Sequence, residues 1–115
     1  RILPEGWVKA TVTPSPANRH WGLHMWIGDP HQERRRFFPA RSQPLGTLHS
    51  EPYVARDVFL FDGSGNQAMW MSPSLRLIVL RFGPTPKAKT GQPGEWDNSF
   101  IPNTIMRGMP AKPKA

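Results

Sequence analysis

The stretch VFLFDGSGNQAMWMSPSLRLIVLRF, residues 58–82, decides the fold. A short apolar run, Val58–Phe61, stops at Asp62-Gly63-Ser64-Gly65-Asn66, and two further apolar runs follow on either side of the turn Ser72-Pro73-Ser74. Branched and aromatic residues separated by glycine, serine and proline turns are typical of antiparallel strands. We therefore predict a hairpin over about residues 58–82, with a glycine-hinged bend at residues 62–66.

The second half of this stretch predicts a strand that is covered on both of its faces. Residues 77–80 are four consecutive apolar residues, a pattern that favours a central strand with helices on either side of the sheet. The chain has few residues left to supply such helices. We therefore expect that this chain alone cannot cover both faces of the strand.

Two segments upstream of the hairpin differ sharply in composition. Residues 20–27 are aromatic and branched and end at the turn Gly28-Asp29-Pro30, which predicts a strand over about residues 20–27. Residues 29–56 contain several prolines and little periodicity, so a long surface loop is expected there. His20 and His24 would share one face of the strand, but no third metal ligand is evident, and we expect both to be packed or exposed without a metal.

A helix is predicted over about residues 98–108. Its apolar side chains, at positions 100, 101, 105, 106 and 109, fall on one helix face, and Pro102 is tolerated in a first turn. Asp97, Asn98 or Ser99 would serve as the N-cap. The predicted fold class is therefore α/β, of the α+β type, with antiparallel sheet strands and a C-terminal helix.

Length and composition exclude several classes of protein. The 115 residues allow one domain or part of one, and the chain begins at Arg1, so we expect a piece of a longer product. Cysteine is absent, which excludes disulfides, cysteine-ligated zinc and a thiol nucleophile. No apolar run approaches the roughly 18 residues of a membrane span. The absence of cysteine fits either side of a membrane, so the compartment stays open.

The positive charge suggests a second class of function. Fifteen lysines and arginines against eight acidic residues give a net charge of +7, and the only basic block is Arg34-Arg35-Arg36, followed by Phe37-Phe38. Such a loop could bind phosphate and stack a base, which would make the chain a non-catalytic basic module for an acidic partner or nucleic acid. The other interpretation is a solvated loop. Because no recognition helix or aromatic RNA-binding strand is evident, nucleic acid is not the expected partner.

Three segments together resemble the C-terminal end of serine hydrolases of the β-lactamase and penicillin-binding-protein type. They are residues 61–83, FDGSGNQ followed by MSPSLRLIVLRFG, residues 20–26, HWGLHMW, and residues 95–98, EWDN. The order and spacing are similar to those in relatives of class C β-lactamases and of 6-aminohexanoate-dimer hydrolase. The resemblance extends over roughly residues 1–109.

This resemblance implies a fold and a site. The family fold is an antiparallel sheet with helices on both faces plus a helical lobe, and residues 1–115 would be the C-terminal portion of that single domain. The segment Gly63, Ser64, Gly65, Asn66 and Gln67 would border the active cleft as the oxyanion and substrate-binding strand. One backbone N–H there would join that of the nucleophile in the oxyanion hole. The alternative is a tight turn without a chemical role.

The resemblance also shows what this chain lacks. The family needs a serine with a lysine three residues later, and no serine here has one. We assign no catalytic role to Tyr53, the only tyrosine in the chain. Lys89-Thr90-Gly91 spells the family's third motif, but it lies in a proline- and glycine-rich loop, and Ser64 is expected to contact substrate rather than to act as nucleophile.

These observations predict an incomplete enzyme. By itself the chain should be inactive, with no catalytic nucleophile, base, metal or cofactor of its own. An N-terminal segment or second chain of the same hydrolase would complete it, and the substrate would be a small amide or ester. A remnant that uses this fold only structurally is a further alternative.

Overall fold

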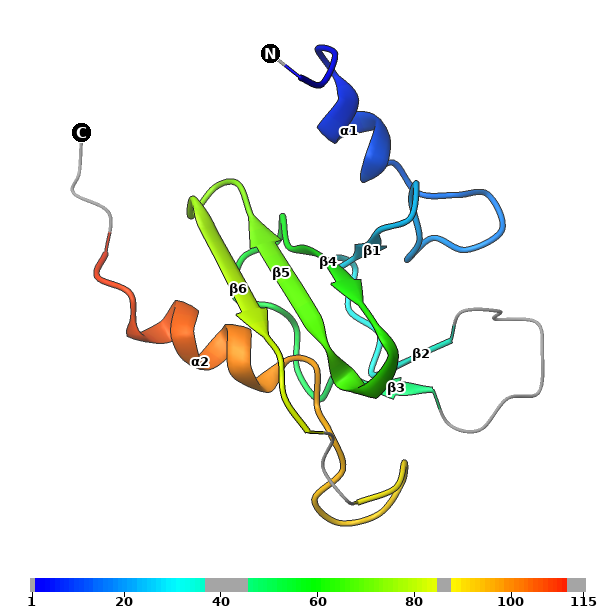
Figure 1. The fold of residues 1–115 in the computed structure, drawn as a ribbon, viewed down its shortest axis with the longest axis vertical. Helices are drawn as coiled ribbons and strands as arrows, with labels where there is room; N and C mark the ends of the chain where they lie inside the picture. The colour runs from blue at the N-terminus through cyan, green and yellow to red at the C-terminus, as the bar shows by residue number, and fades with distance from the viewer. Residues whose placement is uncertain (1, 37–45, 85–87, 112–115) are drawn as a thin grey trace.

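The computed structural model describes residues 2–36, 46–84 and 88–111, which form a small α+β fold (Figure 1). A four-stranded antiparallel sheet, in the order β1-β4-β5-β6, packs against one C-terminal helix, which confirms the predicted combination of antiparallel strands and helix. In chain order the elements are α1 (Trp7–Thr11), β1 (Trp26–Ile27), β2 (Arg34–Arg35), β3 (Thr47–Leu48), β4 (Phe59–Asp62), the 3-10 helix η1 (Ser64–Asn66), β5 (Ala68–Ser72), β6 (Leu77–Arg81) and α2 (Phe100–Gly108).

The predicted hairpin region, residues 58–82, contains three strands. β4 pairs with β5 from Phe59↔Met71 to Asp62↔Ala68, and β5 pairs with β6 from Ala68↔Arg81 to Ser72↔Leu77. The two connections fall at the glycine-containing bend and at the Ser72–Ser74 turn, because these residues accept turn geometry that apolar strand residues resist. The result is a continuous meander of β4, β5 and β6.

One face of the sheet carries the core. Residues on β5 alternate, and Trp70 is buried against α2 while Met69 and Met71 point to the opposite face. Leu60 and Val79 flank Trp70 on the neighbouring strands, as the antiparallel register requires. The full set of buried apolar side chains in this core is Tyr53, Ala55, Val58, Leu60, Ala68, Trp70, Val79 and Met106.

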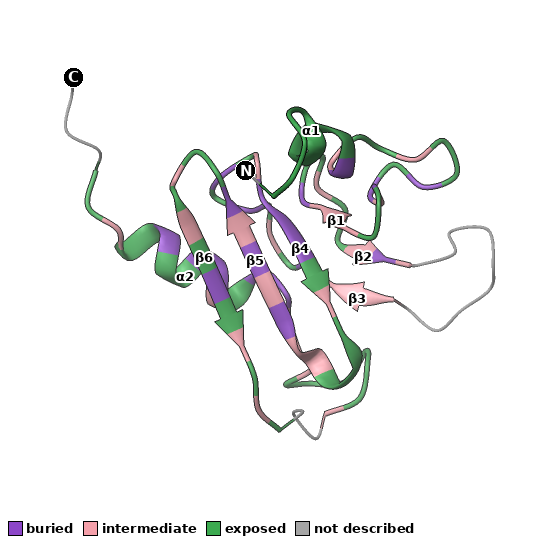
Figure 2. Cartoon of the chain, turned by 45° about the horizontal axis from the view of Figure 1, so that its top comes forward, coloured by how far each residue is buried: buried purple, intermediate pink, exposed green. Residues whose placement is uncertain are grey.

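The opposite face of the sheet is largely bare. Ile78, Leu80 and Phe82 on or after β6 are 67%, 56% and 75% exposed, and Phe61 on β4 is 42% exposed. Figure 2 shows this as exposed residues alternating with more buried ones along β6. β6 is also the last strand of the sheet. Within this chain β6 is thus an edge strand and not the predicted central one, and among the described residues α2 covers only one of its faces, in line with the expectation that this chain alone cannot cover both.

The strand predicted over about residues 20–27 is shorter than expected. Only Trp26 and Ile27 form β1, and the preceding residues make a tight loop in which Gly22 N donates to Met25 O over 2.8 Å. His24 adopts a left-handed φ of 59°, which is incompatible with a strand. Gly22 lies so close to α1 that an added Cβ would be 2.0 Å from the Thr11 carbonyl oxygen. The segment therefore folds back on itself, with a bridge between Trp21 and Trp26, and Leu23 N donates to the Thr11 carbonyl oxygen at the end of α1 over 3.0 Å.

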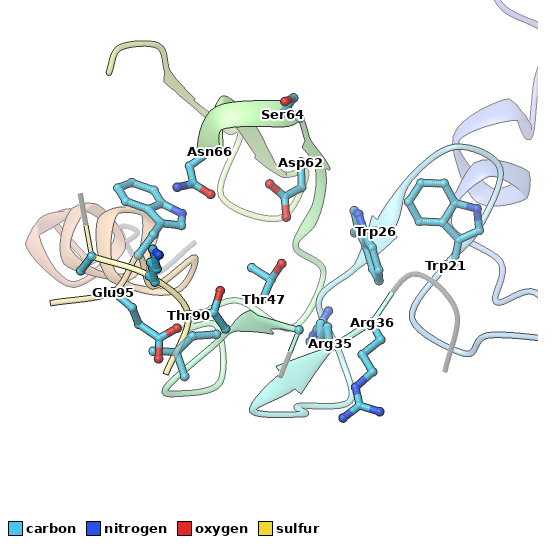
Figure 3. Close-up of a pocket in the computed structure, with 16 residues that line it drawn as sticks. Trp21, Trp26, Arg35, Arg36, Thr47, Asp62, Ser64, Asn66, Thr90 and Glu95 are labelled. Carbon is cyan, nitrogen blue, oxygen red and sulfur yellow. The ribbon is translucent and has the colours of Figure 1, made fainter. Parts of the chain in front are cut away.

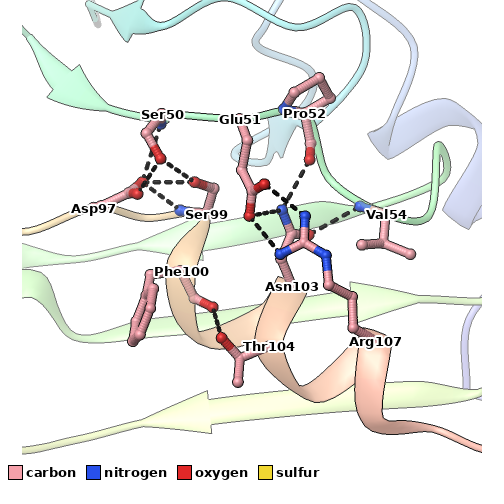
Figure 4. A network of polar contacts seen from close by, with 10 residues as sticks. All are labelled: Ser50, Glu51, Pro52, Val54, Asp97, Ser99, Phe100, Asn103, Thr104 and Arg107. Atoms are coloured by element: carbon pink, nitrogen blue, oxygen red, sulfur yellow. Dashed lines mark hydrogen bonds and ion pairs between the residues drawn. The ribbon is translucent and has the colours of Figure 1, made fainter.

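The segment 29–56 is more ordered than the predicted surface loop. β2 and β3 form a separate two-stranded ladder, and Arg35, His49 and Tyr53 are buried. Hydrogen bonds also tie its last part to α2, as Figure 4 shows. The Asp97 carboxylate accepts from Ser50 N and Ser99 N, and Asn103 bonds the backbone of Pro52 and Val54. These tertiary bonds, which composition does not reveal, hold the segment on the body of the protein.

Among the residues that the structure describes, no helix has the length and apolar character needed to cross a membrane.

Candidate functional site

The predicted oxyanion segment forms one compact bend between β4 and β5. Ser64, Gly65 and Asn66 make the 3-10 helix η1, and Gly63 and Gln67 flank it. Gly65 and Asn66 have left-handed φ angles of 73° and 60°, a conformation that glycine and asparagine tolerate best. The structure thus brings Gly63, Ser64, Gly65, Asn66 and Gln67 together at the surface, in a bend that only this composition accommodates easily.

Two side chains hold the bend in place. Gln67 Nε2 donates to Gly83 O over 2.7 Å, and Gly83 N donates back to Gln67 Oε1 over 3.0 Å. Arg81 Nη1 donates to the carbonyl oxygens of Gly65 and Asn66, at 3.3 and 2.9 Å. The same guanidinium lies 4.6 Å from the ring centroid of Trp96, a cation–π distance. The bend is therefore attached to the end of β6 and to the segment before α2.

Hydrogen-bond geometry limits which backbone N–H groups near the bend are available to donate to an oxyanion. Gly63 N donates to Gln67 O over 2.7 Å, so this amide is already occupied. Successive strand residues direct their backbone groups to opposite edges, and the Val58 carbonyl accepts from Gly28 N toward β1. Asp62 therefore directs its N–H to the β1 edge as well. Because β1 pairs only with Phe59 and Leu60, no described strand covers that edge at Asp62.

A pocket of about 700 Å³ lies beside this edge (Figure 3). Tryptophans contribute much of its apolar wall, and Trp21 and Trp26 meet edge to face with ring centroids 4.9 Å apart. Hydroxyl and amide side chains supply polar groups. The lining residues are Trp21, Trp26, Arg35, Arg36, Gly46, Thr47, Leu48, Asp62, Gly63, Ser64, Asn66, Ala88, Lys89, Thr90, Glu95 and Trp96. An apolar concavity with a few polar groups is the usual form of a small-molecule site.

Asp62 is the most distinctive polar group in the pocket. Its carboxylate projects between Asn66 and Trp26 in Figure 3, and Asn98 Nδ2 donates to Oδ2 over 2.9 Å. Trp96 Nε1 in turn donates to Asn98 Oδ1 over 2.5 Å. Burial raises the pKa of Asp62 above its ordinary value, and the Asn98 hydrogen bond lowers it in part. From the sequence, Asp62 was identified only as a turn residue. Its position at the end of a strand was the one signal that could have marked it as a site residue.

The basic block is largely used within the chain. Arg34 forms a two-pronged ion pair with Glu95, at 2.5 and 2.8 Å. Arg35 is buried and donates to the carbonyl oxygens of Ile27 and Gly28. Arg36 is half-buried. Phe37 and Phe38, the aromatic part of the predicted loop, lie outside the described residues.

The other residues singled out in the sequence lie apart from one another. Lys89 and Thr90 line the pocket, but with Gly91 they lie in a loop and not in a strand. Tyr53 is buried beneath the sheet, accepts a hydrogen bond from Trp70 Nε1 over 3.2 Å, and has its pKa raised by burial. His20 is buried while His24 is exposed. The described residues contain no group of three side chains suited to a metal ion.

Comparison with known proteins finds no matching family model, no matching curated protein and no matching solved structure.

Proposed function

We propose that this chain is the C-terminal part of a β-lactamase-like serine hydrolase that cleaves an amide or ester bond. It contributes the oxyanion strand, Gly63–Gln67 with the adjoining edge of Asp62, and one wall of the substrate pocket. The observation that carries the proposal is the edge of β4 at Asp62, which no strand of the described residues covers, together with the aromatic pocket that Asp62 and the bend help to line. Fixed N–H groups at such an edge can stabilise negative charge on a carbonyl oxygen.

The chemistry divides between this chain and the missing segment. A serine hydroxyl on that segment attacks the substrate carbonyl carbon while a lysine amine accepts the hydroxyl proton. The carbonyl π electrons move to oxygen, and a backbone N–H at the β4 edge or the bend donates to that oxyanion. The C–N or C–O bond then breaks, the leaving group takes up the proton, and water hydrolyses the acyl-enzyme. Loss of one oxyanion donor costs about 10²-fold or more in rate.

The bare sheet face supports the proposal that a further polypeptide segment packs against this chain. Ile78, Leu80 and Phe82 form an exposed apolar stripe along the edge strand, where water contact is unfavourable. We define the bare face as Phe61, Met69, Met71, Ile78, Leu80 and Phe82. Helical or other apolar polypeptide packed on it would give β6 the second cover that its apolar sequence predicts.

The basic-module alternative has less support. Arg34 pairs with Glu95, and Arg35 donates to backbone carbonyls, so two of the three arginines in the block have partners inside the chain. Phosphate binding at Arg34 or Arg35 would compete with these contacts.

A labelling experiment tests the hydrolase proposal. The tagged chain is expressed in its source cells, purified with what it binds, and treated with a fluorophosphonate probe. We expect the probe on the serine of a Ser-x-x-Lys sequence in a co-purifying polypeptide or contiguous segment, identified by peptide mass spectrometry. This chain by itself should not be labelled. Label on Ser64 in the isolated chain, or no label on any Ser-x-x-Lys serine, would contradict the proposal.

A pair of glycine variants tests the role of the bend. Gly65→Val places a branched residue at φ 73°, which distorts the bend, and we expect labelling at least tenfold slower. Gly6→Val is the matched control, because Gly6 has φ 77° and no other atom within 4 Å of an added Cβ, far from the bend in sequence. Equal labelling rates for both variants would show that the bend takes no part in the mechanism.

A further inference from the structure

We propose that the outer edge of β6 binds an extended, acidic peptide segment as an additional antiparallel strand of the sheet. β6 is the last of the four strands, and Figure 1 shows no other strand beside it among the described residues. The inference goes beyond the proposed function and does not depend on it, because strand addition requires neither a nucleophile nor a substrate pocket.

The hydrogen-bond register of the sheet identifies which groups of β6 face outward. Gly63 N donates to Gln67 O, a pair in register with those of β4 and β5. Backbone groups alternate between the two edges of a strand, so Trp70, three residues after Gln67, directs its groups to β6. Val79 is its partner there and is therefore bonded inward, to β5.

Ile78 and Leu80, on either side of Val79, therefore direct their N–H and C=O groups to the outer edge. No hydrogen bond within the described part of the chain engages these groups. The two side chains are 67% and 56% exposed, on the bare face. Unpaired backbone groups that repeat at every second residue are the template to which an extended peptide adds as a strand.

The outer edge also lacks the residues that usually prevent strand addition, namely proline, lysine and inward-pointing charges. Between Leu77 and Phe82 there is no proline, lysine or acidic residue. The one charged residue of this stretch, Arg81, donates to carbonyl oxygens of the bend and lies over Trp96. The stretch therefore presents neither a missing backbone donor nor a free charge to an added strand.

The charge of the chain favours an acidic occupant over a second copy. Fifteen lysines and arginines against eight acidic residues give a net charge of +7. Arg76, directly before β6, is exposed, and the ion pairs of the described residues do not include it. A second copy would bring an equal positive charge to the edge, whereas an acidic segment is attracted to it. Apolar side chains at every second position of that segment would lie beside Ile78 and Leu80.

A synthetic peptide tests the proposal on the purified chain. The probe is acetylated, amidated Val-Thr-Val-Thr-Val-Thr-Glu, which in the antiparallel direction pairs its valines with the outer edge and brings its glutamate to Arg76. We expect saturable binding that slows hydrogen exchange of the Ile78 and Leu80 amides about tenfold or more in NMR spectra. The Val79 amide, already bonded to β5, should change little. Absence of saturable binding, or binding without this protection, would overturn the proposal.

Matched peptides separate strand pairing from other modes of binding. N-methylation of the middle valine removes an N–H that faces β6 and should weaken binding about tenfold or more, whereas N-methylation of the threonine after it removes an N–H of the opposite edge and should change affinity little. Equal losses would contradict strand pairing. Lysine in place of the glutamate should weaken binding about threefold at low salt. An equal affinity for the lysine peptide would contradict the acidic occupant.

Two protein variants locate the binding edge. Leu80→Pro removes an outward N–H, a change that edge strands accept, and peptide affinity should fall about tenfold or more. Phe61→Ser is the control, because Phe61 belongs to the bare face but lies on β4, and affinity should be unchanged; an equal loss would assign binding to the face instead. If Leu80→Pro does not fold, the methylated peptides decide on the natural chain. Protection of Ile78 and Leu80 without peptide, rising with chain concentration, would show that a second copy occupies the edge and would overturn the acidic occupant.

Discussion

Gln67 and Gly83 are joined by two reciprocal hydrogen bonds, side-chain amide to backbone, at 2.7 and 3.0 Å. The pair ties the start of β5 to the end of β6. It also fixes the point at which the bend meets the edge strand, so that the geometry of the candidate site depends on this amide side chain together with the Arg81 guanidinium.

Replacing Gln67 by alanine should loosen the bend. Both bonds are lost, and we expect the free energy of unfolding to fall by about 1–2 kcal/mol. Amide hydrogen exchange measured by mass spectrometry should accelerate in the peptide that covers residues 63–67. Gln92→Ala, an exposed glutamine in a turn, is the control. Unchanged hydrogen exchange at the bend in Gln67→Ala would show that the bend does not depend on the Gln67 side chain.

Arg81 should not be replaceable by lysine. The guanidinium donates to several carbonyl oxygens around the bend and lies over Trp96, which an ammonium cannot reproduce in that geometry. We expect Arg81→Lys to lower the free energy of unfolding by about 1–2 kcal/mol in urea titrations. Arg56→Lys, at a side chain that is almost fully exposed, should change it by less than about 0.5 kcal/mol. Similar losses of unfolding free energy in both variants would argue against a specific role for the Arg81 guanidinium.

Asn103 holds the segment before β4 onto α2. It accepts from Val54 N over 2.9 Å and donates to Pro52 O over 2.8 Å, and it is fully buried (Figure 4). Because alanine would leave these backbone groups unsatisfied, we expect Asn103→Ala to lower the free energy of unfolding by about 2–3 kcal/mol. Thr104→Ala, next in sequence but exposed, should be nearly neutral. Chemical denaturation of the two variants side by side measures the difference.

The bare face can be tested with paired lysine substitutions. Ile78→Lys with Leu80→Lys should leave the chain folded by circular dichroism, because both side chains are exposed, and should reduce binding of a hydrophobic dye. Val79→Lys, between them but buried, should abolish cooperative unfolding. Unfolding by the double variant would show that the face is already buried. If the hydrolase proposal holds, the double variant should also fail to retain the labelled partner.

Stability should fall on mild acidification because of His49. Burial, reinforced by the charge of Arg35, lowers the pKa of His49 from 6.5 to about 3. The unfolded chain therefore takes up a proton at this residue before the folded chain does, so its contribution is complete above pH 6.5 and is lost progressively toward pH 3. Urea midpoints at pH 7.5 and 5 should differ less in His49→Gln than in the natural chain. The exposed His24→Gln should keep the full difference.

Local composition was sufficient to predict antiparallel strands over residues 58–82, although as a hairpin and not as a three-stranded meander, and most of the extent of α2. Ser72-Pro73-Ser74 and the glycines of the bend favour turns, and the apolar spacing from Phe100 to Met106 favours a helix. The predicted apolar face of that helix is only partly right, because the structure buries Pro102, Asn103 and Met106 while Phe100 and Ile105 are exposed. The antiparallel sheet with a C-terminal helix followed from these signals. The oxyanion role of the bend stays a prediction.

Features that depend on distant contacts were not predictable. The aromatic residues before Trp26 favour one continuous strand by propensity, but the segment folds back on itself between Trp21 and Trp26 and bonds to Thr11 at the end of α1. The apolar pattern of residues 77–80 describes a strand covered on both sides, and this chain supplies one cover. Asp62 accepts a hydrogen bond from Asn98, 36 residues later, which no local pattern encodes.

The proximity of Gly22 to Thr11 has a consequence for how this sequence can vary. A Cβ at position 22 would sit 2.0 Å from a carbonyl oxygen that belongs to the backbone, so no rotamer change can relieve the collision. In a saturation-mutagenesis library selected for solubility, we expect position 22 to return glycine alone. Position 108, where an added Cβ meets nothing within 4 Å, should accept many residues.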